Sequence, residues 1–131
     1  MRLSQRSIRR LKGIDPILID ILLEAIKDSP FDFGIPLYGG LRTIEQQEAL
    51  YSIGRTTELD RKPVTWTKKS YHMTGKAFDI YAYVDGKPTW DAKYYKPIAR
   101  HLQKVAKFSF CTLLEWGGDW RRKDLPHFQI K

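Results

Sequence analysis

The chain has 131 residues, a length that fits one domain around one hydrophobic core. Its 23 lysine and arginine residues outnumber 15 acidic residues, and the net charge of +8 favours an anionic partner. No apolar run reaches the roughly 18 residues of a membrane-spanning helix, and the basic start lacks the apolar core of a secretory signal peptide. We therefore expect a single domain over residues 1–131, without a signal peptide or membrane insertion.

Two helices are expected at the start of the chain. Residues 4–11 suit a short helix. Asp15 followed by Pro16 is typical of an N-cap and a first helical residue. The second helix then carries an apolar stripe at helical spacing and ends at Ser29 and Pro30. The stripe, which predicts part of the core, consists of Ile17, Leu18, Ile21, Leu22 and Ala25.

A short strand and a third helix follow. Residues 33–39 favour a strand, and Pro36 places it at a sheet edge because proline has no N–H to donate. Thr43 and Gln46 have the spacing of a capping box, which predicts a helix over residues 44–53. Residues 55–69 are polar and indicate a long loop of the kind that often binds ligands. Within it, Trp66 either lines a substrate groove or pins the loop to the body.

The segment around residue 75 predicts a turn followed by a strand over residues 76–84. Gly75 can take a positive φ, so the chain can turn sharply just after His72. Alternation along the strand then separates two faces. Phe78, Ile80, Ala82 and Val84 form the apolar face, whereas Ala77, Asp79, Tyr81 and Tyr83 form the other.

Three side chains of this pattern suit a zinc ion. His72 and Asp79 offer nitrogen and oxygen ligands of the kinds that zinc accepts, and His127 offers a third near the end of the chain. Phe128 and Ile130 are expected to point inward, which turns His127 and Gln129 to the other face. Two strands of one sheet would then bring the three ligands together, with one zinc position left for water.

The C-terminal half predicts one more helix and one more strand. Asp91 caps a helix that extends to about residue 107, although Pro97 suggests a later start. The apolar residues 108–116 suggest a strand, in which Cys111, the single cysteine, would be a buried small hydrophobe. His101 falls on the helix outside any motif, so we expect a surface or partly buried histidine and no ligand.

The segment from Ser70 to Asp79 resembles the SxHxxGxAxD signature of the M15 family of zinc peptidases, which cut peptidoglycan stem peptides. All fixed positions match, namely Ser70, His72, Gly75, Ala77 and Asp79. Two further segments resemble the family in the same order. Gly40, Arg42, Thr43 and Gln47 match an upstream motif, and Asp124 lies three residues before His127, as the family's acidic residue does.

The resemblance implies a Hedgehog/DD-peptidase-like α+β fold, with a small antiparallel sheet and helices packed on one side. It also implies zinc ligands at His72, Asp79 and His127, and a general base at Asp124. In this chain the base is aspartate where many members have glutamate, so Asp119 in the Gly-Gly-Asp-Trp turn is a rival. The same resemblance assigns substrate binding to Arg42, Gln47 and Ser70.

A short chain of this type most resembles the phage L-alanyl-D-glutamate endopeptidases, which act as endolysins. A D-alanyl-D-alanine carboxypeptidase is the nearest alternative, and a non-catalytic zinc domain that binds cell wall is another. A nucleic-acid binder would leave the metal triad unexplained. We therefore expect a monomer that binds peptidoglycan, without a separate wall-binding domain. It would stay in the host cytoplasm until another factor releases it, and basic clusters (Arg2, Arg6, Arg9, Arg10 and Lys12; Arg121, Arg122 and Lys123) would favour anionic envelope surfaces.

Overall fold

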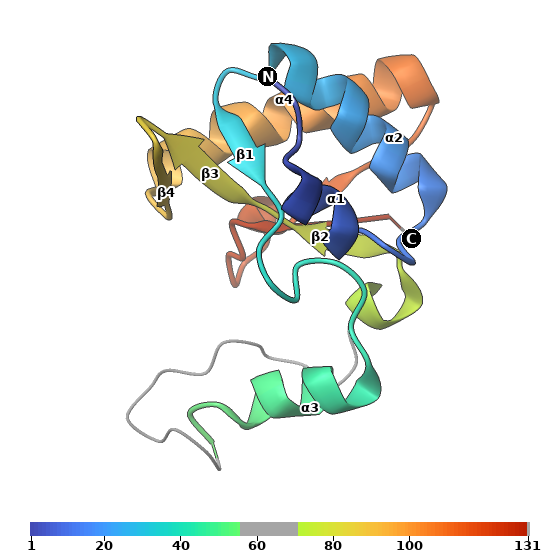
Figure 1. Ribbon diagram of the computed structural model, residues 1–131, viewed down its shortest axis with the longest axis vertical. Coiled ribbons are helices and arrows are strands. Elements are labelled where there is room, and N and C mark those ends of the chain that lie inside the picture. The colour runs from blue at the N-terminus through green and yellow to red at the C-terminus, as the bar shows by residue number, and fades with distance from the viewer. Residues whose placement is uncertain (56–70, 131) are drawn as a thin grey trace.

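The fold is described from a computed structural model that defines residues 1–55 and 71–130 (Figure 1). Its helices are α1 (Gln5–Arg10), α2 (Pro16–Ala25), α3 (Ile44–Ser52) and α4 (Ala92–Phe110), with 3₁₀ turns at Ile26–Asp28, Tyr71–Thr74 and Gly117–Asp119. Its strands are β1 (Asp32–Gly34), β2 (Ala77–Asp79), β3 (Tyr81–Val84), β4 (Lys87–Thr89), β5 (Glu115–Trp116) and β6 (His127–Gln129). This mixture confirms the predicted α+β class.

The strands form two small antiparallel sheets where the sequence suggested one. Their orders are β1-β3-β4 and β2-β6-β5. The run predicted as one strand over residues 76–84 supplies both sheets, because Ile80 separates β2 from β3. The backbone N–H of Ile80 donates to the carbonyl of Pro126 at 3.0 Å, so it stays hydrogen-bonded at the crossover. The predicted alternation holds at the centre of the run, since Phe78, Ile80 and Ala82 are fully buried.

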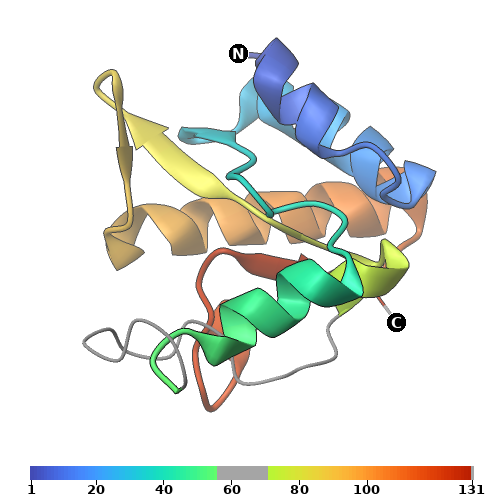
Figure 2. The same cartoon turned by 60° about the horizontal axis from the view of Figure 1, so that its bottom comes forward.

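Helices α2 and α4 pack against each other and supply much of the core. Phe78 of β2 and Phe128 of β6 join that core as stacked rings with centroids 5.2 Å apart. In both views, α3 lies on the side of the strands away from α2 and α4 (Figures 1 and 2). Among the described residues, no helix combines the length and apolar character that crossing a bilayer requires.

Side-chain caps begin the helices where the sequence predicts them. The Ser4 hydroxyl accepts from Ser7 N, and Asp15 Oδ1 accepts from Ile17 N, both at 3.1 Å. Thr43 and Gln46 form the complete capping box before α3. The capping box therefore fixes the start of α3 at Ile44, with Thr43 as the one residue between Arg42 and the helix.

Two predicted strands are shorter than expected. The segment 33–39 is a strand only over Asp32–Gly34, and it ends before Pro36, whose carbonyl accepts from Gly39 N in a turn. The segment 108–116 contributes only Glu115–Trp116, because α4 continues to Phe110. The side chains of Phe108 and Leu113 are 73% and 84% exposed, so these two apolar residues lie outside the core, whereas Leu114 and Trp116 belong to it.

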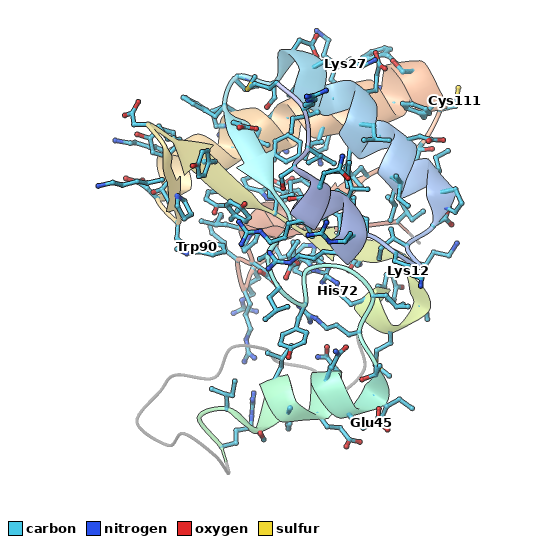
Figure 3. The ribbon with its side chains drawn as sticks, viewed as in Figure 1. Lys12, Lys27, Glu45, His72, Trp90 and Cys111 are labelled. Atoms are coloured by element: carbon cyan, nitrogen blue, oxygen red, sulfur yellow. The ribbon has the colours of Figure 1, made fainter. Side chains whose placement is uncertain are left out.

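The buried position predicted for Cys111 is also wrong. Cys111 ends α4 in the left-handed conformation with φ of 49°, and its side chain is exposed (Figure 3). The later start suggested for α4 is wrong as well: Asp91 caps it, and Pro97 lies inside. Lys93, whose carbonyl loses a donor at Pro97, is exposed to solvent and so can bind water. His101 is partly buried as predicted, with Nε2 2.8 Å from the carbonyl oxygen of Ala25.

The turn after His72 gives a test of this fold. Gly75 has φ of +74°, and a Cβ there would lie 2.8 Å from the Gly13 carbonyl oxygen. Gly86 has φ of +77° but open space around the same position, so it is a matched control. We expect Gly75→Ala to lower the free energy of unfolding by about 2–3 kcal/mol and Gly86→Ala by about 1 kcal/mol. Urea denaturation measures both, and equal losses would contradict the close approach to Gly13.

Candidate metal centre

Three potential ligand atoms converge where β2 and β6 pair. His72, Asp79 and His127 each offer one such atom, and these atoms lie within 4.8 Å of one another. Asp79 Oδ1 is 3.1 Å from both His72 Nε2 and His127 Nδ1, and these two nitrogens are also 3.1 Å apart. Two imidazoles and one carboxylate form a donor set that fits zinc. The structure thus brings together the three residues that the sequence predicts as ligands.

The register of the sheet explains why Asp79 meets His127. In the antiparallel β2–β6 pair, Asp79 lies directly opposite His127, and Phe78 lies opposite Phe128. Phe78 and Phe128 are fully buried, so alternation turns the next pair away from the core. The core contact therefore aims the two potential ligands at the same side.

A hydrogen bond to the backbone fixes the orientation of His72. Its imidazole is almost fully buried in the turn Tyr71–Thr74 (Figure 3). Nδ1 lies 2.9 Å from the Gly40 carbonyl oxygen, which can only accept a hydrogen bond. Nδ1 therefore donates, and in the neutral ring the lone pair of Nε2 faces Asp79 and His127. A backbone bond from Arg42 N to the His72 carbonyl, at 3.0 Å, ties the same turn to the segment before α3.

Arg42 holds the other oxygen of Asp79. Its Nη2 donates to Asp79 Oδ2 at 3.1 Å, its Nη1 to Gln47 Oε1 at 3.0 Å, and its Nε to the Tyr38 carbonyl at 2.8 Å. Gln47 is fully buried one turn into α3. Three of the five N–H donors of this guanidinium therefore bind the protein itself, which fixes Arg42 beside the carboxylate.

The electrostatics of the cluster suit a bound cation. Burial alone would raise the pKa of Asp79, but hydrogen bonds from the imidazolium forms of His127 and His72 hold it far below its ordinary value. Burial opposes protonation of His127, yet its hydrogen bond to Asp79 raises the pKa of the imidazole. Positive charge is thus favoured among these atoms, whether protons or a metal ion supply it.

The two candidate bases occupy different environments. The side chain of Asp124 is exposed at its outer surface, but the protein atoms around the carboxyl group desolvate it and, with the Asp79 charge, raise its pKa. The charges of His127, His72 and Arg42 oppose that rise, so Asp124 lies within the field of the cluster. Asp119 instead binds Arg100 through both oxygens, at 2.8 and 2.9 Å. Arg100 lowers the Asp119 pKa, and the rival carboxylate is engaged in an exposed ion pair.

Some contacts of the site were not anticipated from the sequence. His127 Nε2 lies 2.7 Å from Gln129 Oε1, and Gln129 Nε2 donates to Glu115. The Trp120 ring lies 5.2 Å from the His127 ring. The alternation of side chains along the strand, which places Gln129 on the face of His127, is the sequence signal from which the Gln129 contact could have been predicted. Ser70 and Trp66 lie outside the described residues, and their roles stay predictions.

The opposite pKa directions of the two aspartates give a test by pH. A carboxyl group with a raised folded pKa destabilises the chain once pH exceeds that pKa, whereas one with a lowered pKa stabilises it above its ordinary pKa. In the presence of a chelator, we expect Asp124→Asn to stabilise the chain at pH 7 by up to about 0.5 kcal/mol, since the residue is exposed, and to change little at pH 3. Asp119→Asn should lower stability at pH 7. Thermal unfolding at both pH values measures this, and the same sign for both variants would refute the assignment.

Comparison with known proteins finds relatives that match most of the chain. A family model described as phage L-alanyl-D-glutamate peptidase matches residues 1–130. The L-alanyl-D-glutamate peptidase of Escherichia phage T5 is 28% identical over 131 residues, which cover 99% of this chain and 89% of that protein. The peptidoglycan L-alanyl-D-glutamate endopeptidase CwlK of Bacillus subtilis (strain 168) is 33% identical over 117 residues, covering 82% of this chain and 68% of that protein.

A solved structure extends the likeness to the fold. The crystal structure of the Serratia marcescens L-Ala D-Glu endopeptidase ChiX superposes with a TM-score of 0.81 at 31% identity, covering 100% of this chain and 90% of that chain. The fold and the family expected from the three sequence segments are therefore confirmed. The chain belongs to the phage L-alanyl-D-glutamate peptidase family.

Proposed function

We propose that this chain is a zinc-dependent endopeptidase that cleaves the L-alanyl-D-glutamate bond of peptidoglycan stem peptides and acts as a phage endolysin. The observation that carries the proposal is the convergence of His72 Nε2, Asp79 Oδ1 and His127 Nδ1 in a chain that matches this peptidase family from end to end. Three protein ligands are the usual number in a catalytic zinc site, which keeps one position open.

The ligand set and its surroundings fit the ion. His72, Asp79 and His127 would hold zinc through the atoms that already face one another, while Gly40 and Arg42 keep two of those side chains in place. Outer contacts of this kind orient metal ligands and tune their basicity. When bound, zinc is a Lewis acid that makes water a competent nucleophile near neutral pH.

Asp124 is the proposed general base. Its carboxylate removes a proton from the attacking water and later gives one to the leaving amine of the cleaved peptide. A raised pKa brings the group closer to the pH at which it must accept and release protons. Asp119 is a poorer candidate, because its two oxygens bind Arg100.

Arg42 is proposed to bind the substrate as well as Asp79. Its remaining two N–H groups can hold a carboxylate of the stem peptide or the developing oxyanion. Gln47 accepts a hydrogen bond from the Arg42 guanidinium and so orients it. Ser70 is also proposed to bind substrate. The exposed residues Arg121 and Lys123 follow the Trp120 turn and would attract the anionic wall.

Two alternatives remain testable. A D-alanyl-D-alanine carboxypeptidase would use the same metal centre on a different bond, and a non-catalytic wall-binding domain would use zinc for structure alone. The chain is proposed to act on the cell wall as a monomer. The placement of Asp124 within the field of the ligands favours an enzyme, since a structural zinc needs no general base.

Zinc should stabilise the folded chain. A ligand that binds only the native state adds RT ln(1 + [L]/Kd), which is about 2.7 kcal/mol at 100 times Kd. We expect the melting temperature of chelator-treated protein to rise when zinc is added, and the rise to disappear in His72→Ala. Differential scanning calorimetry with calcium as the control ion measures this. A similar rise in His72→Ala would place the zinc elsewhere.

Peptidoglycan digestion tests the reaction itself. Purified sacculi are incubated with the protein, and the new termini are identified by mass spectrometry. We expect cleavage between L-alanine and D-glutamate, abolished by a zinc chelator and by His72→Ala, and lowered at least about 100-fold in Asp124→Ala because the base is lost. Asp119→Asn is the matched control and should stay active.

Other outcomes of the digestion identify the alternatives. Release of terminal D-alanine would assign the carboxypeptidase. No cleavage of several wall types by folded, zinc-loaded protein would refute the enzyme and leave the wall-binding domain. Equal losses in Asp119→Asn and Asp124→Ala would contradict the choice of base.

A further inference from the structure

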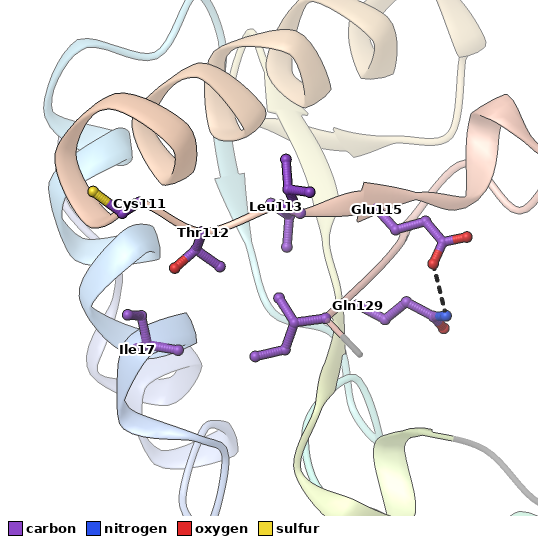
Figure 4. Close-up of a pocket in the computed structure, with 8 residues that line it drawn as sticks. Ile17, Cys111, Thr112, Leu113, Glu115 and Gln129 are labelled. Atoms are coloured by element: carbon purple, nitrogen blue, oxygen red, sulfur yellow. Dashed lines mark hydrogen bonds between the residues drawn. The ribbon is translucent and has the colours of Figure 1, made fainter.

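Glu115 of β5 accepts hydrogen bonds from Gln129 and Trp120, and both of these side chains contact the imidazole of His127. Glu115 Oε2 accepts from Gln129 Nε2 at 3.1 Å, the bond drawn in Figure 4, and Glu115 Oε1 accepts from Trp120 Nε1 at 2.9 Å. Gln129 Oε1 in turn lies 2.7 Å from His127 Nε2, and the Trp120 ring lies 5.2 Å from the imidazole. None of these three residues belongs to the proposed ligands, base or substrate contacts.

The pairing of the strands places this group. Gln129 lies opposite Glu115 of β5 on one side and opposite Ala77 of β2 on the other. Ala77 is fully buried and small, so it leaves room for the Gln129 side chain. Because side chains alternate along a strand, Gln129 shares the face of His127, two residues away. Glu115, Gln129 and His127 are therefore linked by two consecutive hydrogen bonds that lead from β5 to the metal centre.

The chemistry of these groups allows only one direction of hydrogen bonding. A carboxylate can only accept, so Gln129 must present its NH₂ group to Glu115 and its carbonyl oxygen to His127. That oxygen also only accepts, so His127 Nε2 must carry the hydrogen. In the neutral imidazole, Nδ1 then has the free lone pair, and Nδ1 is the atom 3.1 Å from both His72 Nε2 and Asp79 Oδ1.

We propose that Glu115 and Gln129 are positioning residues that set the tautomer and the orientation of His127 for metal binding. Glu115 acts indirectly. It accepts a hydrogen bond from Gln129 and so orients it, and it orients Trp120 beside the His127 ring in the same way. The inference rests on the proposed zinc site. It adds that zinc affinity depends on a carboxylate that never contacts the metal.

The substitution Glu115→Gln tests the direction of hydrogen bonding with almost no change of shape. Its single carbonyl oxygen is needed by Trp120, which can only donate, so its NH₂ group faces Gln129. Gln129 must then turn its carbonyl oxygen toward the new NH₂ group at position 115 and its own NH₂ group toward His127. This arrangement favours the His127 tautomer with hydrogen on Nδ1. That hydrogen occupies the position of the metal. We expect the Kd for zinc to rise 10- to 100-fold, the usual effect of losing an outer contact of a ligand.

The double substitution Glu115→Gln with Gln129→Glu should restore binding. Glu at position 129 accepts from both His127 Nε2 and the new amide, and the amide oxygen still accepts from Trp120. The total charge of residues 115 and 129 is unchanged. The hydrogen bonds again run in the direction that keeps hydrogen on His127 Nε2. We expect a Kd within a few-fold of that of the unsubstituted chain. Glu24→Gln is the matched control, because Glu24 forms an exposed ion pair with Lys27 on a different part of the molecule.

The measurement is competition for zinc alone between the full chain and a chromophoric chelator, with melting of the chelator-treated proteins alongside. We expect Glu115→Gln to bind zinc more weakly while its melting temperature stays nearly unchanged. We expect the double variant to regain the zinc affinity of the unsubstituted chain within a few-fold. It is overturned if Glu115→Gln binds zinc as tightly as the unsubstituted chain, or if the double variant is no better than the single one. Failure of the unsubstituted chain to bind zinc would instead overturn the proposed metal site, and the inference with it.

Discussion

The antiparallel pairing of β2 with β6 is the constraint on which the centre depends. It places Asp79 directly opposite His127, although 48 positions separate them in the chain. The pairing is maintained by burial of Phe78 against Phe128 on the opposite face, so the apolar core and the polar centre are two sides of the same contact. A slip of one residue would exchange the faces and bury the ligands in the core. The register therefore couples stability to function.

Around that pair, each potential ligand is held by a group outside the cluster. The Gly40 carbonyl orients His72, Arg42 holds Asp79, and Gln129 holds His127. In both histidines the outer nitrogen faces an acceptor oxygen, which leaves the inner nitrogen free to bind. These contacts fix the orientation of the potential ligands, and preorganised ligands lose less freedom on binding.

The acidic residues near the centre suit different roles because their surroundings differ. Hydrogen bonds and charges of His127 and His72 keep Asp79 ionised, whereas desolvation and the Asp79 charge raise the pKa of Asp124. Two carboxylates with pKa values moved in opposite directions suit one ligand and one proton carrier. The pKa of Asp119 is also lowered, but by Arg100, which holds its carboxylate in an exposed ion pair. The proposed reaction therefore needs Asp124 within the field of the ligands and outside the ligand set.

The amino-acid sequence by itself determined the local features of this protein. Ser4, Asp15 and Thr43 cap helices through hydrogen bonds that span only two or three residues, so pattern alone locates them. Spacing and alternation likewise indicated the three potential metal ligands that the structure brings together. Local pattern failed at residues 108–116, where an apolar run suits a strand or a helix equally well, and α4 continues with Phe108 exposed and Cys111 at its end.

Only the tertiary structure decided the features that join distant segments. It divided the expected sheet in two, engaged Asp119 with Arg100 from α4, and brought Glu115 to Gln129 across the β5–β6 pair. These contacts depend on how strands and helices pack, and packing is a property of the whole core. The sequence thus indicated the groups that are proposed to carry the chemistry, and the fold decided which partners orient them.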